Sequence, residues 1–90
     1  MSNLSEAVLL KAIKDFPYRE KSFYDYCVSS ENIEPKGWAL GIIDLFVLES
    51  VISQDDFKYY LTPKGLKRLE DFKVNLRPAF NFLYKEAENG

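Results

Sequence analysis

The chain has 90 residues, of which 47% are apolar and 29% charged, a composition typical of one soluble globular domain and not of a disordered chain. Its formal net charge is -2, and it holds no histidine and one cysteine, Cys27. This excludes an intramolecular disulfide, a zinc site built from cysteine and histidine, and catalysis by histidine.

Residues 4–16 predict the first helix, since apolar residues recur along them at helical spacing. Asn3 suits the N-cap, and Glu6 three positions later completes a capping box. Pro17 ends the helix because a proline disfavours helical backbone at the residue before it.

The next segment predicts a connection and a shorter helix. Residues 18–21 form either a loop or one short strand, and Ser22 caps a helix over residues 23–29. Cys27 falls on the apolar side of that helix, where we expect a small buried residue and not a nucleophile.

The third predicted helix runs from Pro35, which suits a first turn, to about Glu49 and is apolar on almost every side. Gly37 and Gly41 each cost about 1 kcal/mol inside a helix, so either a neighbour approaches closely or the helix begins later. A helical projection directs five side chains to the core: Trp38, Ala39, Ile42, Leu45 and Phe46. Three others extend the apolar surface outward: Leu40, Ile43 and Val47.

After this helix the hydrophobic period becomes that of a β-hairpin. Residues 51–53 and 57–61 predict two strands joined by a turn over residues 54–56. Thr62 and Pro63 suit the cap and the first position of a fourth helix. The side chains that this helix directs inward are Leu66, Leu69 and Phe72.

Pro78 disfavours one continuous helix to the C-terminus, so we place a new helix cap at Asn75. The fifth helix, over residues 76–88, has one apolar stripe of Leu76, Ala79, Phe80, Leu83 and Tyr84. We expect a mainly α fold with a small β-hairpin (α+β), in the order helix, helix, helix, hairpin, helix, helix. Residues 1–90 form a single domain, in which residues 74–90 are a C-terminal helix beside a core of residues 1–73.

The chain predicts no membrane contact. Its most apolar run covers residues 39–48, which is half the length of a membrane span and includes Asp44. No basic segment precedes the first apolar residues, so we expect no export signal and a cytoplasmic location.

The stretch from Leu45 to Glu70 includes Tyr59, Leu61, Thr62 and Gly65 in the pattern Y-x-L-T-x-x-G. This stretch and the order of elements resemble the winged helix-turn-helix family, in particular small bacterial and archaeal regulators of the PadR and MarR kind. One departure is Ser50, because the family usually has glycine where the chain leaves the recognition helix.

The resemblance implies a transcriptional regulator that binds duplex DNA as a homodimer, with the third helix in the major groove and the wing near the backbone. Residues 1–57 carry a net charge of −5 and residues 58–85 a net charge of +5. The wing tip at Asp55 and Asp56 has the wrong sign for phosphate, and the third helix offers few base-reading side chains. The candidate DNA contacts are therefore Lys36, Lys58, Lys64, Lys67 and Arg68.

The alternative is a winged-helix module that binds another protein and not DNA. Its candidate surface is apolar and comprises Leu40, Ile43, Val47, Phe80, Phe82 and Tyr84. Phe82 lies off the main stripe of the last helix, and the rings of that helix either face a partner or pack back on the first helix as core. Homodimerisation through the first and last helices would serve either function.

We expect no enzymatic activity, no cofactor and no metal. Cys27 has no histidine partner, and Asp55 with Asp56 is typical of a solvated turn. Trp38 is interpreted as a packing anchor, with an effector pocket beside Tyr24 and Tyr26 as the alternative.

Overall fold

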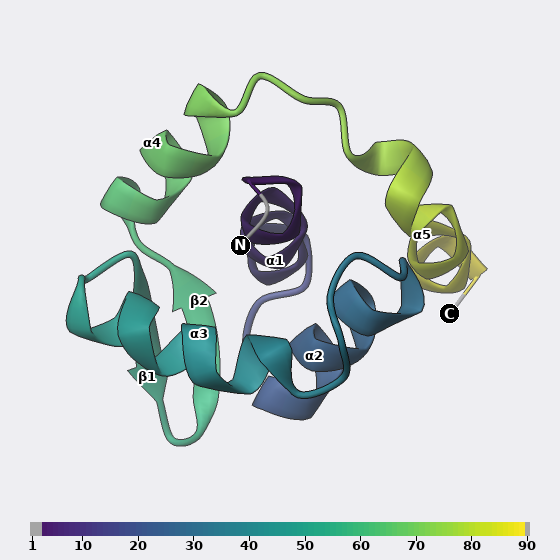
Figure 1. Ribbon diagram of the computed structural model, residues 1–90. Coiled ribbons are helices and arrows are strands. Elements are labelled where there is room, and N and C mark those ends of the chain that lie inside the picture. Colours follow the sequence, from purple (N-terminus) through teal and green to yellow (C-terminus); the bar gives the residue numbers. More distant parts are fainter. Residues whose placement is uncertain (1–2, 90) are drawn as a thin grey trace.

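The computed structural model describes residues 3–89, which form a mainly helical domain with one two-stranded antiparallel hairpin (Figure 1). The order of helices and hairpin agrees with the expected α+β class. The described elements are α1 (Asn3–Asp15), α2 (Lys21–Ser30), α3 (Trp38–Leu48), β1 (Ile52–Asp55), β2 (Lys58–Leu61), α4 (Pro63–Asp71), the 3-10 helix η1 (Arg77–Phe80) and α5 (Asn81–Asn89).

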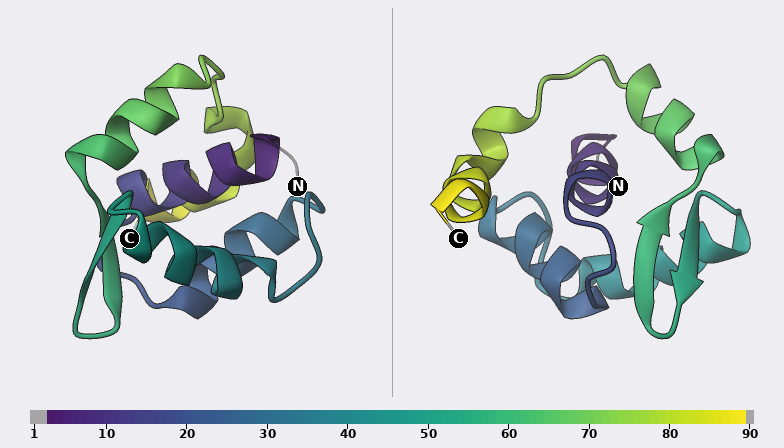
Figure 2. Two further views of the ribbon diagram at one scale, coloured as in Figure 1. Left: turned by 60° about the vertical axis from the view of Figure 1, so that its left-hand side comes forward. Right: turned by 180° about the vertical axis from the view of Figure 1, so that it is seen from behind.

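Helix α1 lies at the centre of the molecule, and the other elements surround it (Figures 1 and 2). Its side chains are buried on several sides, among them Val8, Leu9, Leu10, Ala12 and Ile13. Most apolar residues of α1 are therefore covered within the chain itself, and homodimerisation through this helix stays a prediction.

The segment between α1 and α2 is attached to the hairpin. Arg19 forms an antiparallel bridge with Tyr59, and the Tyr18 N–H donates to the Tyr59 carbonyl oxygen at 2.7 Å. Of the two alternatives for this segment, the short strand is closer to what the structure shows. Helix α2 begins directly afterwards at Lys21, so Ser22 lies inside the helix and is not its cap.

Helix α3 begins at Trp38, three residues later than Pro35. Gly37 precedes it with a φ of 93°, a left-handed conformation that glycine adopts at little cost. The Gly37 N–H donates to the buried Asp25 carboxylate at 2.7 Å, which fixes the connection from α2. Of the two alternatives, close approach of a neighbour or a later start of the helix, the later start is therefore the correct one at Gly37.

The hairpin turn lies one residue later than expected. β1 pairs with β2 from Ile52 opposite Leu61 to Asp55 opposite Lys58, so the tip is Asp56-Phe57. Both tip residues have a positive φ, 50° and 66°. A two-residue turn of this kind matches the twist of the strands, although it normally uses Asn or Asp followed by glycine.

Helix α4 begins where it was predicted, whereas the segment after it differs from the predicted single helix. Thr62 caps α4 by accepting from the Gly65 N–H, and Pro63 is its first residue. The chain restarts where the Asn75 side chain accepts from the Arg77 N–H, but it first forms η1 and only then α5. The stripe itself is confirmed, since Leu76, Phe80 and Leu83 are buried. Leu66, expected inside, is instead exposed.

The Tyr24 phenol and the Cys27 thiol of α2 are both buried in the core. Tyr24 is fully buried, donates to the Phe16 carbonyl oxygen at 2.7 Å, and has its pKa raised by burial to about 12. Burial likewise raises the pKa of the Cys27 thiol from 9.0 to about 12, so this thiol stays protonated at neutral pH. Cys27 is buried and free, which confirms its interpretation as a small core residue.

These two raised pKa values predict alkaline unfolding. In the unfolded chain the Cys27 thiol ionises near pH 9.0 and the Tyr24 phenol near pH 10.0, whereas the folded state keeps both neutral up to about pH 12. Stability from both groups is therefore complete below pH 9.0 and is lost as the pH rises towards about 12. In urea unfolding curves across this range, Cys27→Ala should show a shallower pH dependence than the wild type. The same pH dependence of stability in both proteins would show that the Cys27 thiol does not have a raised pKa.

No helix within residues 3–89 is long and apolar enough to span a bilayer.

Candidate functional site

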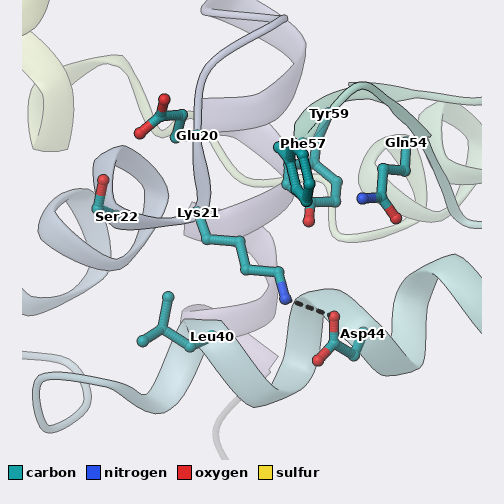
Figure 3. Close-up of a pocket in the computed structure, with 8 residues that line it drawn as sticks. All are labelled: Glu20, Lys21, Ser22, Leu40, Asp44, Gln54, Phe57 and Tyr59. Atoms are coloured by element: carbon teal, nitrogen blue, oxygen red, sulfur yellow. Dashed lines mark hydrogen bonds and ion pairs between the residues drawn. The ribbon is translucent and has the colours of Figure 1, made fainter.

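A groove opens between the start of α2, helix α3 and the hairpin (Figure 3). It has a volume of about 580 Å³, which is within the range of ordinary ligand pockets. Its lining combines apolar, acidic, basic and amide side chains: Glu20, Lys21, Ser22, Leu40, Asp44, Gln54, Phe57 and Tyr59.

An ion pair crosses this groove. The Lys21 side chain extends from α2 to α3, where its Nζ lies 2.7 Å from Asp44 Oδ1 (Figure 3). The hydrogen bond to Asp44 raises the pKa of Lys21. Asp44 remains largely exposed to solvent, so its carboxylate is accessible from outside. This pair could not be expected from sequence patterns, because the two residues are 23 positions apart.

The outward arc of α3 is mainly apolar. Leu40, Leu45 and Leu48 are exposed, Leu48 to 81%. Two predictions from the helical projection are wrong here. Leu45, predicted in the core, is exposed, and Ile43, predicted on the outward surface, is fully buried. Ala39, Ile43 and Phe46 make up the buried stripe of the helix. Val47 is only half-buried.

Phe57 at the hairpin tip is, together with Leu40, a large exposed apolar side chain that lines the groove. It is 73% exposed and has a left-handed backbone, which costs a non-glycine residue about 1–2 kcal/mol. The tip extends beyond the helices (Figure 2). We use the term α3–hairpin face for the exposed Leu40, Leu45, Leu48 and Phe57. The exposure of Leu48 and Phe57 was not predicted from the sequence. For Phe57, its position next to the predicted turn could have indicated that the ring is exposed.

Two of the basic side chains expected to contact DNA are engaged at the end of α3. Lys64 donates to the Glu49 carbonyl oxygen at 2.8 Å, and Arg68 pairs with the Glu49 carboxylate at 3.1 Å. Arg68 also lies over the Phe46 ring, 5.7 Å from its centroid. Cations at a helix C-terminus stabilise its unpaired carbonyl groups, so these two side chains have a structural role.

The other three cations lie on separate elements. Lys67 is exposed on α4, and Lys58 is exposed on β2 directly opposite Asp55. Lys36 lies in the connection before α3 and lines a second depression together with Tyr26 and Leu40. The five candidates therefore lie on α4, on β2 and in the connection before α3, and do not follow the outward arc of α3.

The aromatic side chains of the last helix contact the chain itself. Phe80 is fully buried, and Phe82 packs edge-on against Tyr26 with 6.2 Å between ring centroids. Tyr84 donates to the Asp15 carboxylate and lies 5.8 Å from the Phe16 ring. Phe80 is therefore a core residue and not part of an exposed surface, whereas Phe82 and Tyr84 are half-buried against Tyr26 and Phe16. Partner binding through this helix stays a prediction.

Trp38, Tyr24 and Tyr26 do not line one pocket together in the described part of the chain. Tyr24 is fully buried, whereas Tyr26 is half exposed and contacts Phe82. Trp38 is partly buried against the core, as expected of a packing anchor. Within residues 3–89 no three acidic, cysteine or histidine side chains form a group that could hold a metal.

The described fold and site define a small α+β domain, mainly helical, with one antiparallel hairpin. No protein-family model, curated protein or solved structure matches the chain. The α3–hairpin face, with its exposed apolar side chains and acidic surroundings, is therefore the candidate functional site.

Proposed function

We propose that the chain is a winged-helix domain that binds another protein through its α3–hairpin face. The order of three helices followed by a hairpin supports the winged-helix assignment. The bridge between Arg19 and Tyr59 supports it further, since it pairs the segment before α2 with β2 at one position.

The observation that carries the proposed function is the exposure of large apolar side chains on α3 and the hairpin tip, with Leu48 at 81% and Phe57 at 73%. Leu40 of α3 and Phe57 of the tip line the same groove. Exposed apolar groups that gather on one surface are typical of protein interfaces. Phe57 also occupies a strained backbone position that glycine would occupy at lower cost. A large ring kept at such a position, without being buried, contributes nothing to the core, and a contact with a partner accounts for it.

The charge of this face disfavours DNA as the ligand. Base reading from the major groove uses Arg, Lys, Asn or Gln, whereas the outward arc of α3 presents leucines and Asp44. The hairpin tip adds Asp55 and Asp56, which repel phosphate.

The proposal is tested with peptides selected from a random displayed library against the immobilised protein. For peptides resynthesised after selection, Leu48→Glu should weaken binding at least tenfold, about 1.4 kcal/mol, because it replaces the most exposed apolar side chain of the face by a charge. Val74→Glu is the control, since Val74 is an apolar residue outside the face that is also more than half exposed. Equal effects of the two substitutions would count against the proposal.

A DNA-binding homodimer is the second candidate, supported by the exposed Lys58, Lys64 and Lys67. Fluorescence anisotropy of a labelled random 30-mer duplex at low and physiological salt distinguishes it, since phosphate contacts lose orders of magnitude of affinity over that range. Salt-dependent binding that disappears when Lys64, Lys67 and Arg68 are replaced by Glu would replace the protein-binding proposal. We expect no such binding.

A further inference from the structure

We propose that the groove between α2, α3 and the hairpin binds an arginine side chain of the partner protein. This inference rests on the proposed protein-binding role of the α3–hairpin face and specifies what that face recognises. Leu40 and Phe57 line the groove and also belong to the face, so one partner segment can contact both.

The charge of the groove and its rim suits a cation. Glu20 and Asp44 line it, whereas Lys21 is its single basic lining residue and is already paired with Asp44. At the hairpin tip, Asp55 is opposite Lys58 in the register, and Asp56 adds a further negative charge. The Glu20 carboxylate offsets the partial positive charge at the start of α2. A basic partner is therefore the electrostatic complement of this surface.

Lys21 shows how a long cationic side chain fits. Its methylene groups extend across the groove, and its ammonium reaches Asp44 (Figure 3). An incoming guanidinium can pair with the exposed Asp44 carboxylate in place of Lys21. The internal lysine is then a competitor of the ligand, which is a property that an experiment can measure.

The Phe57 ring favours arginine over lysine. Within the described part of the chain, three arginines already lie over aromatic rings: Arg19 over Phe23 at 5.1 Å, Arg68 over Phe46 at 5.7 Å, and Arg77 over Tyr84 at 5.1 Å. Phe57 offers a similar ring that remains mostly exposed at the groove. A planar guanidinium stacks on such a ring and can also pair with a carboxylate, whereas an ammonium forms only a point contact.

A second copy of the chain fits this face poorly. A two-fold axis through the α3–hairpin face would bring Asp44, Asp55 and Asp56 of both copies into one interface. Like charges placed together in an interface oppose association. The occupant to which the surface points is thus a different protein with an arginine between apolar residues.

The test is a titration of the ¹⁵N-labelled protein, followed by backbone amide signals, with the peptide acetyl-Gly-Leu-Arg-Leu-Gly-amide. The arginine peptide should shift the signals of Lys21, Asp44 and Phe57. The same peptide with citrulline, which is neutral and almost the same shape as arginine, should bind at least tenfold more weakly. The lysine peptide should lie between the two.

Two substitutions should weaken binding of the arginine peptide, and a third should strengthen it. Asp44→Asn should weaken binding of the arginine peptide at least fivefold, since it removes the charged partner. Phe57→Gly should weaken it by a similar factor while leaving the melting temperature unchanged or higher, because glycine suits the positive φ. Lys21→Ala should strengthen binding severalfold by removing the internal competitor. Lys67→Ala, which removes the same charge from α4, is its control and should have little effect.

Binding that does not distinguish arginine from citrulline, or shifts confined to other residues, would overturn the inference. An equal gain from Lys21→Ala and Lys67→Ala would also overturn it, since the effect would then come from net charge. If the affinity of the selected peptides falls in Leu48→Glu but is unchanged in Asp44→Asn and Lys21→Ala, the proposed arginine site is wrong and the protein-binding role stands. Duplex binding through α4 without any effect of Leu48→Glu would instead remove the protein-binding role itself.

Discussion

Replacing Gly65 by alanine is expected to destabilise the fold by about 3 kcal/mol, at the upper end of the usual cost of overpacking. A Cβ atom at this position would lie well inside van der Waals contact with the Val51 carbonyl oxygen and 3.0 Å from Leu61 Cδ1. The backbone at Val51 cannot retreat freely, because its carbonyl accepts from the Thr62 N–H at 3.2 Å and from Thr62 Oγ1 at 2.8 Å. Relieving the clash therefore disturbs the start of α4.

Urea unfolding of Gly65→Ala measures this effect, and Gly41→Ala is its control. Gly41 lies inside α3, and no heavy atom lies within 4 Å of the Cβ that alanine would add. Alanine there should stabilise the protein by up to about 1 kcal/mol, through helix propensity alone. Opposite signs for the two substitutions are the expected result, and destabilisation by Gly41→Ala similar to that of Gly65→Ala would show that close contact is not the cause.

The role of Gly65 explains why one part of the sequence was informative. The pattern from Tyr59 to Gly65 describes a strand whose end is fixed to the start of α4 by hydrogen bonds of Thr62, with glycine required where the two segments touch. Such constraints act between residues that are neighbours in sequence. The positions of the hairpin and of the α4 cap could therefore be predicted to within about two residues.

The orientation of α3 could not be predicted in this way. The helix is apolar on almost every side, so its periodicity did not decide between Ile43 and Leu45 for the core. The choice depends on which face meets α1, α2 and the hairpin, and this is a property of the whole fold. The exposed Leu48 and the ion pair between Lys21 and Asp44 follow from that orientation and were missed for the same reason.

Ser50 has a backbone conformation that its residue type did not predict. The resemblance indicated glycine where the chain leaves α3, and Ser50 has a φ of 61° in the left-handed region. The backbone conformation that normally requires glycine is thus kept, although the residue is different. A residue type alone did not reveal this conformation.

Attachment of the C-terminal segment to the rest of the domain depends mainly on Phe80. This side chain is fully buried in the same apolar cluster as Leu76 and Leu83. On the polar side, the segment is held by the hydrogen bond from Tyr84 to Asp15, beside the ion pair of Lys11 with Asp15 at 3.0 Å. Because Phe80 belongs to the common core, we expect η1, α5 and the other helices to unfold in one transition.

Phe80→Ala should therefore lower the free energy of unfolding by about 3–5 kcal/mol, the usual cost of removing a buried phenylalanine ring. Phe82→Ala is the matched control with an expected loss of about 1 kcal/mol, since Phe82 is only half-buried and packs on the partly exposed Tyr26. The measurement is urea unfolding at two protein concentrations a hundredfold apart. If Phe80 lay at an interface between two copies, the midpoint would rise with protein concentration. For a side chain buried within one chain, the midpoint stays the same at both concentrations.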